Sequence, residues 1–270
     1  MSAAQSPRYT HGHHEAVLRS HRWRTVENSA AYLVPHLAPG VSLLDVGCGP
    51  GTITLDFAQR VAPGRVVGID AASAAIDAAT AEGESLGLSN VEFRTADLYA
   101  LDFADNTFDI VHAHQVLQHV PDPVGALREM RRVCKPGGVV AARDADYAAF
   151  TWYPASPWLV AWQDMYRTVA RANQGEPDAG RYLLAWAHAA GFTDVEAGAS
   201  TWCYATPEDR AWWGKLWADR VTESAIAGQA VELGVATADE LREMAAAWNQ
   251  WAAEPDGWYA VLHGEFLARA

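Results

Sequence analysis

The stretch of sequence that decides the fold is LLDVGCGPG, residues 43–51. A short apolar segment of strand character ends in glycines at positions 47, 49 and 51, and a helical pattern begins at Thr52. Glycine adopts the left-handed backbone that a sharp strand-to-helix turn requires, and it lets a ligand lie against the chain near the helix N-terminus. The stretch therefore predicts an α/β fold with a ligand site at this turn.

The spacing of these glycines and the residue before them separate two classes of ligand. Dinucleotide-binding turns follow the pattern G-x-G-x-x-G, whereas this chain has G-x-G-x-G. Asp45 lies two residues before Gly47, where its negative charge would repel a pyrophosphate and attract a sulfonium that carries an α-amino group. The pattern favours S-adenosylmethionine over a nicotinamide dinucleotide.

Two more aspartates end the next predicted strands. Asp70 follows Gly51 by 19 residues, at a place where a carboxylate can accept hydrogen bonds from both hydroxyls of a ribose. Asp97 ends the third strand, where it would accept a hydrogen bond from the adenine amino group, with Leu98 beside the ring. The carboxyl ends of parallel strands meet at one edge of a sheet, so these aspartates and the glycines are predicted to surround one nucleoside.

Outward from the glycines, strands and helices alternate along residues 40–145. The strand segments are too apolar for a sheet with one solvent-facing side, so the alternation predicts a mostly parallel sheet with helices on both faces. We expect strands at 42–46, 65–70, 91–94, 108–113 and 138–143, and helices at 13–36, 52–61, 73–86 and 124–134.

The composition changes after Phe150, because eleven of the 12 tryptophans lie beyond it. Helical patterns are expected at 158–172, 181–190 and 207–256, with an extended segment at 192–206 and a closing strand at 258–268. We interpret 207–256 as a helical insertion between the last two strands that lies over the acceptor site, rather than as a separate domain. Its tryptophans either form the core of the inserted helices or line an aromatic pocket.

Residues 40–145 resemble the class I S-adenosylmethionine-dependent methyltransferases, in particular the ubiquinone/menaquinone C-methyltransferase-like (methyltransferase type 11) family. The motifs that carry the resemblance are the glycine motif 43–51, the ribose motif 66–70, the adenine motif 96–98, the fourth-strand motif 108–111 with 116–123, and the stretch 127–140. The resemblance implies a doubly wound α/β fold with a mostly parallel seven-stranded sheet in the order 3-2-1-4-5-7-6, the last strand antiparallel. We expect a single methyltransferase domain over 1–270, with 40–145 as its cofactor-binding half and 1–38 as an N-terminal helical lid.

The candidate site residues form three groups. Cofactor binding is assigned to residues at the ends of the first four strands: Asp45, Gly47, Cys48, Gly49, Gly51, Asp70, Ala71, Ala96, Asp97, Leu98, His114 and Gln115. The candidate catalytic residues are Tyr147, after strand five, and His119, which either packs a turn before Pro121 or acts on the acceptor. The candidate acceptor residues are Tyr9, His14, His21, Trp23 and Asp146. The N-terminal histidines have no convincing set of carboxylates or cysteines beside them, so a lid is favoured over a metal site.

These observations predict an enzyme that transfers the methyl group of S-adenosylmethionine in line to a small, aromatic or hydrophobic acceptor and releases S-adenosylhomocysteine. The nucleophile is O, N, S or C. The net charge of −13 argues against nucleic-acid and anionic-membrane partners. The sequence has no signal-like or membrane-spanning segment, which predicts a cytoplasmic protein, as a monomer or homodimer. The alternatives are a protein or RNA methyltransferase, a nicotinamide-dependent oxidoreductase and a non-catalytic binding protein.

Overall fold

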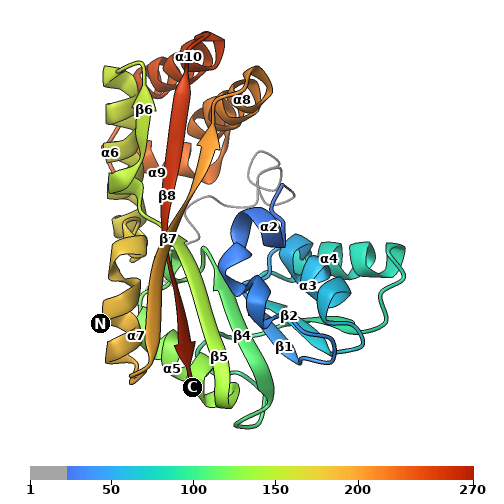
Figure 1. Cartoon of the computed structure of the whole chain (residues 1–270). Coiled ribbons are helices and arrows are strands. Elements are labelled where there is room, and N and C mark those ends of the chain that lie inside the picture. Colours follow the sequence, from blue (N-terminus) through green and yellow to red (C-terminus); the bar gives the residue numbers. More distant parts are fainter. Residues whose placement is uncertain (1–22) are drawn as a thin grey trace.

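The LLDV stretch forms β1 (Leu43–Val46), a strand in the middle of the sheet. In the computed structural model, which describes residues 23–270, β1 pairs in parallel with β2 (Val66–Asp70) on one side and with β4 (Phe108–His114) on the other (Figure 1). All residues of β1 are buried, because helices cover both faces of the sheet.

The strands lie side by side in the order β3-β2-β1-β4-β5-β8-β7, and β8 runs antiparallel to β5 and β7. This order confirms the predicted 3-2-1-4-5-7-6 arrangement with an antiparallel last strand, because one extra short strand, β6, raises the later numbers by one. No pattern in the sequence predicts β6, which is three residues long and pairs with the start of β8, beyond the end of β5. The bounds of the other strands are β3 Val91–Thr95, β5 Cys134–Ala145, β6 Thr151–Tyr153, β7 Val195–Tyr204 and β8 Trp258–Arg269.

Helices cover the two faces of the sheet and define two apolar cores. One core lies between the sheet and helices α5 and α7, where Leu127, Met130 and Leu183 are buried. The other lies between the sheet and α3, where Phe57 packs with Val26 of the chain before β1. The bounds are α3 Thr52–Val61, α4 Ser73–Ser85, α5 Pro123–Val133 and α7 Leu183–Ala189. Each of these helices starts and ends close to its predicted bounds.

The chain before β1 departs from the single helix predicted over 13–36. Among the described residues it forms a four-residue helix, α2 (Val26–Ser29), and a 3-10 helix, η1 (Ala31–His36). Thr25 has an extended backbone and caps α2, with hydrogen bonds exchanged between Thr25 and Asn28. Because a capping box starts a helix, no helix continues through this position. Residues 1–22, which include most of the predicted lid, lie outside the described part of the chain.

A second helical region surrounds the first half of β8 (Figure 1). Three helices, α8, α9 and α10, follow β7 and precede β8 in the chain, and α6 packs against this group. Their shared core is aromatic, since Trp162 contacts Trp217 and Trp248 at ring-centroid distances of 4.5 and 4.9 Å, and all three are buried. The bounds are α6 Pro157–Ala172, α8 Pro207–Glu223, α9 Ala225–Glu232 and α10 Ala238–Ala253, with 3-10 helices η2 Leu117–His119, η3 Tyr147–Ala149 and η4 Ala179–Tyr182.

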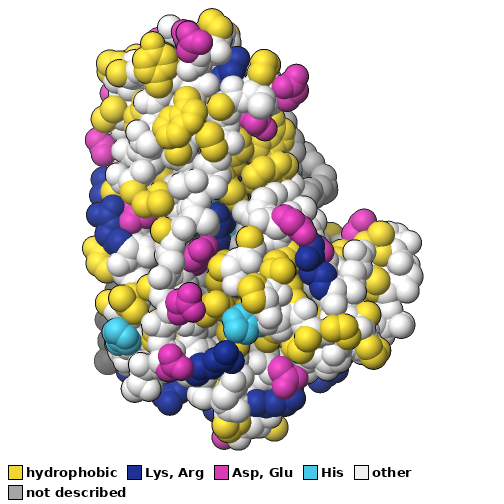
Figure 2. All heavy atoms as spheres, viewed as in Figure 1, with side chains coloured by type: hydrophobic (Ala, Val, Ile, Leu, Met, Phe, Trp, Pro, Cys, Tyr) yellow, Lys and Arg dark blue, Asp and Glu magenta, His cyan; other side chains and the backbone are white. Residues whose placement is uncertain are grey.

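The surface in view in Figure 2 has no single basic region. Lys and Arg side chains are interspersed with Asp and Glu side chains over this face. Within residues 23–270, no helix is long and apolar enough to cross a membrane.

Replacing Trp162 by alanine should lower the free energy of unfolding by about 3–5 kcal/mol, because the side chain is fully buried among aromatic rings and its loss leaves a large cavity. Val160 lies in the same helix with 48% of its surface exposed, so Val160→Ala should cost less than about 1 kcal/mol. Urea unfolding followed by circular dichroism measures both changes. Equal losses would show that the helical region is not packed around Trp162.

Candidate active site

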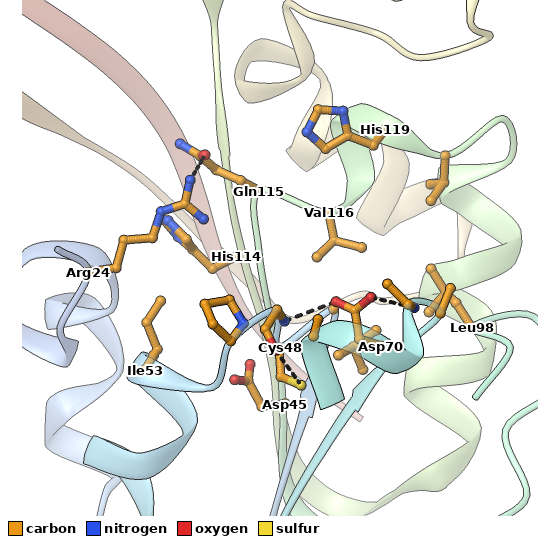
Figure 3. A pocket seen from close by; sticks show the side chains of 18 of the residues that line it. Arg24, Asp45, Cys48, Ile53, Asp70, Leu98, His114, Gln115, Val116 and His119 are labelled. Atoms are coloured by element: carbon orange, nitrogen blue, oxygen red, sulfur yellow. Dashed lines mark hydrogen bonds between the residues drawn. The ribbon is translucent and has the colours of Figure 1, made fainter. Parts of the chain in front are cut away.

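A cavity of about 780 Å³ opens at the carboxyl edge of β1, β2, β3 and β4. The glycine turn and the strand ends line one side of it, and aromatic side chains from β7 and α8 line another. Figure 3 shows the side chains around the turn. The volume is within the range of sites for cofactors and small molecules, which is about 300–1,000 Å³.

The glycine turn forms one wall of the cavity. Gly47 has a φ of +67°, and a Cβ atom there would lie 2.4 Å from Cγ2 of Val116. Gly51 has a φ of +83° and precedes α3, where a Cβ atom would lie 2.8 Å from helix α4. Both positions therefore require glycine for conformation and for space. The cavity is lined by Gly47, Cys48 and Gly49. Gly51 does not line it and instead packs against α4.

Asp45 is buried at the start of the turn, and its carboxylate is already bound by the protein. One oxygen accepts a hydrogen bond from the hydroxyl of Thr54 on α3 at 2.5 Å, and the other lies 2.8 Å from Nδ1 of His112 on β4. Both oxygens thus have protein partners, and only 3% of the residue is exposed. Burial also raises the pKa of the neighbouring Cys48 thiol, so this thiol stays protonated.

Asp70 connects the end of β2 to the glycine turn, as Figure 3 shows. Its carboxylate accepts hydrogen bonds from the backbone amides of Gly49 and Ala72, both at 2.9 Å. Asp97 follows β3 and accepts a hydrogen bond from the amide of Tyr99 at 2.9 Å. The structure thus brings the predicted residues of three strand ends to one wall, which also includes Ala71, Ala96 and Leu98.

His114 and Gln115 end β4 on the other side of the turn. His114 is buried at the cavity wall, and neither of its ring nitrogens has a hydrogen-bond partner among the described residues. Burial, reinforced by Arg24 and Arg143, holds the pKa of His114 well below its ordinary value, so the ring is neutral at pH 7. Gln115 has a φ of +54°, and its side-chain oxygen accepts a hydrogen bond from Arg24 at 2.6 Å. Buried polar atoms at a cavity wall suit a ligand with polar groups.

The two predicted catalytic residues both lie on the cavity wall. Burial, followed by the charge of Arg24, lowers the pKa of His119 to about 3, and its Nε2 lies 3.0 Å from the side-chain nitrogen of Gln118. His119 is therefore neutral at physiological pH and a weak base. The ring of Tyr147 stacks on Tyr166 at a centroid distance of 3.9 Å. Both residues thus belong to the cavity wall, and neither of these contacts marks its residue as a general base.

Asp146 and Trp23, two of the predicted acceptor residues, are not among the residues that line this cavity. Asp146 is not on the cavity wall, because its two oxygens accept hydrogen bonds from Arg181, both at 2.6 Å. Trp23 packs edge-on against Trp202 at 5.3 Å and does not line the cavity. Tyr9, His14 and His21 lie outside the described residues. Within 23–270, no three His, Cys, Asp or Glu side chains gather in a way that would hold a metal ion.

No pattern in the sequence predicts Arg24, Trp202 and Arg220 at the wall, and for the tryptophans of the insertion the sequence leaves a core role and a pocket role open. Trp213 and Trp217 on α8 and Trp202 on β7 form the aromatic part of the wall, and Arg220 stacks over Trp217 at 5.1 Å. The four-residue spacing of Trp213 and Trp217 places them on one helix face, which is the one signal in the sequence that could have paired them. No sequence pattern predicts that Arg24 lines the cavity, because its position depends on how the chain before β1 packs.

The sheet order, with the antiparallel β8 beside β5 and a cavity at the glycine turn, is that of the class I methyltransferase fold. Residues 37–213 match the family model described as a methyltransferase domain. The chain belongs to the S-adenosylmethionine-dependent methyltransferases. Its residues fit this cofactor, since the turn excludes side chains at Gly47 and the strand ends present carboxylates and buried polar nitrogens.

Two fungal relatives are similar over the whole chain. An uncharacterised methyltransferase of Schizosaccharomyces pombe is 36% identical over 96% of this chain and 95% of its own length. A probable methyltransferase of Aspergillus luteorubrus is 34% identical over 99% of both chains. Phosphoethanolamine N-methyltransferase 2 of Haemonchus contortus, solved with S-adenosylmethionine, shares the fold with a TM-score of 0.54 at 19% identity, over 88% of this chain and 51% of that chain.

Gly47→Ala should weaken the binding of S-adenosylhomocysteine by about tenfold or more, because the added methyl group would collide with Val116 at the turn. Gly87 is a matched control, since its φ is +66° and no atom lies within 4 Å of an added Cβ. Gly87→Ala should cost stability through the same backbone strain and leave the affinity unchanged. Isothermal titration calorimetry measures both affinities. Equally tight binding by the two variants would show that the cofactor does not bind against this turn.

The free energy of unfolding should fall as the pH is lowered from about 7 to about 5, because three buried histidines, His114, His119 and His263, stay neutral in the folded protein. Their pKa values are lowered, so below the ordinary value the unfolded chain binds more protons than the folded chain. Each histidine contributes up to about 1.4 kcal/mol per pH unit in this window. Asp144 acts in the opposite direction, because burial raises its pKa to about 7 and the folded protein retains that proton.

Asp144→Asn is the control for this pH dependence. It removes the opposing carboxyl group and keeps an oxygen that accepts a hydrogen bond from the Gln118 amide. The loss of stability should then be steeper by about 1.4 kcal/mol per pH unit. Urea unfolding at a series of pH values measures both slopes. A free energy of unfolding that stays constant over this range would contradict the neutral burial of the histidines.

Proposed function

We propose that this protein transfers the methyl group of S-adenosylmethionine to a small, aromatic or hydrophobic acceptor molecule. The observation that carries the proposal is that one cavity joins the glycine turn to the aromatic wall. Cofactor and acceptor must meet in one enclosed space for direct in-line transfer, and this cavity has a polar end and an apolar end. The proposal covers O, N, S and C nucleophiles alike.

The cofactor is proposed to lie along the carboxyl edge of the sheet, with its adenosine towards β2 and β3 and its amino-acid end towards β4. Asp70 would accept hydrogen bonds from the ribose hydroxyls, and Leu98 would contact the base. Arg24 and Gln115 offer hydrogen-bond donors at the amino-acid end. The bound cofactor supplies a methyl group activated on a cationic sulfur. The protein then contributes orientation and the exclusion of water.

The titratable residues of the wall favour an acceptor that needs little help in losing a proton. The pKa of His119 is lowered to about 3, and that of His114 also lies well below its ordinary value, so neither ring is a strong base at pH 7. General base catalysis is most efficient when the pKa of the base lies near the working pH. Positioning of the acceptor against the aromatic wall is therefore the proposed source of catalysis.

A small acceptor is favoured over a protein or RNA substrate. The aromatic side chains Trp202, Trp213 and Trp217 line the end of the cavity that would receive the acceptor. The net charge of −13 disfavours RNA as well. The three cysteines of the chain, Cys48, Cys134 and Cys203, are unpaired, which supports the proposal that the protein works in a reducing compartment such as the cytoplasm.

Incubation of the protein with a cell extract and S-adenosylmethionine labelled in its methyl group tests the proposed function. We expect the label in the dialysable fraction, in molecules that partition into organic solvent. Trp213→Leu should raise the KM for that acceptor and leave the affinity for S-adenosylhomocysteine unchanged, because Trp213 lies on the aromatic wall. Label in protein or RNA would replace the proposal by the alternative methyltransferases. Cofactor binding without any transfer would indicate a non-catalytic binding protein.

A further inference from the structure

The side chain of Gln118 joins the end of strand β5 to the cavity wall. Strand β4 pairs with β5 only as far as Arg143, so the backbone amide of Ala145 lies beyond the last pair. That N–H group donates to Oε1 of Gln118 at 3.2 Å. On its other side, Nε2 of Gln118 lies 3.0 Å from Nε2 of His119, whose ring lines the cavity. Only 3% of Gln118 is exposed, so both contacts are shielded from water.

The backbone of Gln118 is held as well. Its N–H group donates to Oδ1 of Asp144 at 3.0 Å, and its carbonyl oxygen accepts from the N–H group of Glu176 at 2.9 Å. A Cβ atom at Gly175 would lie 2.6 Å from the same carbonyl oxygen, so a larger residue there would push this loop away from Gln118. Each polar group of Gln118 thus has a partner within the fold, which fixes the orientation of its side chain.

These contacts determine which ring nitrogen of His119 carries the proton. A backbone N–H group only donates, so the amide oxygen of Gln118 must face Ala145 and the NH₂ group must face His119. The NH₂ group also only donates, so Nε2 of His119 must accept. Burial lowers the pKa of His119 to about 3, so the ring is neutral and has a single N–H group. With Nε2 as the acceptor, the proton is on Nδ1.

We propose that Gln118 is a positioning residue that holds His119 in its Nδ1–H form, so that His119 shapes the acceptor site and does not serve as the general base of the transfer. The inference rests on the proposed function, in which this part of the cavity receives the acceptor. A general base needs a lone pair that can take a proton. In this form of His119 that lone pair is on Nε2, where the amide of Gln118 occupies it.

The ¹⁵N NMR signals of the His119 ring test this inference directly, because protonated and unprotonated ring nitrogens resonate at well-separated frequencies. Spectra are recorded at pH 7 on the full chain with all 10 histidines labelled, and the signals of His119 are those lost in His119→Gln. We expect Nδ1 to be protonated and Nε2 to be unprotonated. A proton on Nε2, or on both nitrogens, would overturn the inference and leave the proposed function in place.

A pair of glutamine variants tests the role of Gln118 itself. Gln118→Met removes the donor to His119 at similar side-chain size, so part of the molecules should carry the proton on Nε2. Gln229→Met is the matched control, because Gln229 is also buried and its amide oxygen accepts a hydrogen bond from Asn173. This control should leave the signals of His119 unchanged. Unchanged signals in Gln118→Met would overturn the positioning role, and the wild-type spectrum tests the position of the proton even where a variant does not fold.

Transfer of label from S-adenosylmethionine to the acceptor found in the cell extract gives a second readout. His119→Gln keeps a hydrogen-bond donor but has no basic nitrogen, so it should raise the KM for the acceptor and lower kcat by less than about tenfold. Loss of a general base lowers the rate by about 10²- to 10⁴-fold, and a fall of kcat in that range would overturn the inference. A wild-type protein that transfers no label would overturn the proposed function, whereas the NMR signals would still report the position of the proton.

Discussion

The buried carboxylate of Asp45 joins the three elements on which the site depends. It accepts a hydrogen bond from Thr54 on α3 and contacts His112 on β4, while its own strand, β1, leads directly into the glycine turn. A buried carboxylate without such partners would cost several kcal/mol, so these contacts hold the two strands and the helix in one arrangement. The same arrangement brings Val116 against Gly47, where only glycine fits. The fold and the cofactor site therefore depend on one interaction.

Strand β8 connects this arrangement to the aromatic region. Its second half completes the sheet beside β5, and its first half, beyond the end of β5, pairs with β6 while β7 follows its whole length. One uninterrupted strand therefore belongs to both regions. Trp202 and Val261 are opposite each other in the β7–β8 pairing, and both line the cavity. The apolar end of the cavity thus lies where β8 passes from one region to the other.

The features of this protein that could be predicted from its sequence are local. The glycine turn, the aspartates at the strand ends and the bounds of α3 follow from neighbouring residues. The contacts that shape the chemistry join residues far apart, such as Asp45 with His112, 67 residues away, and Gln115 with His263, 148 residues away. No local pattern reports these contacts, because their side chains meet only in the folded sheet, where β4 lies beside β1 and β8 lies beside β5. The prediction of a single helix over 13–36 was wrong for a different reason. There a local signal decides the structure, because the capping box at Thr25 starts a new helix despite the apolar periodicity.

In the proposed placement, the polar side chains of the cavity act on different parts of the cofactor. S-adenosylmethionine and S-adenosylhomocysteine share the adenosine and the amino-acid end, and they differ at the sulfur, which is cationic only before transfer. Contacts of Asp70 with the ribose, or of Arg24 and Gln115 with the amino-acid end, are therefore common to both ligands and cannot favour the cofactor over its product. In this placement the negative charge of Asp45 would distinguish them, because it would attract a cationic sulfur and have no such effect on a neutral one. In this placement, preference for the cofactor over its product would therefore depend on the same buried charge that holds the turn together.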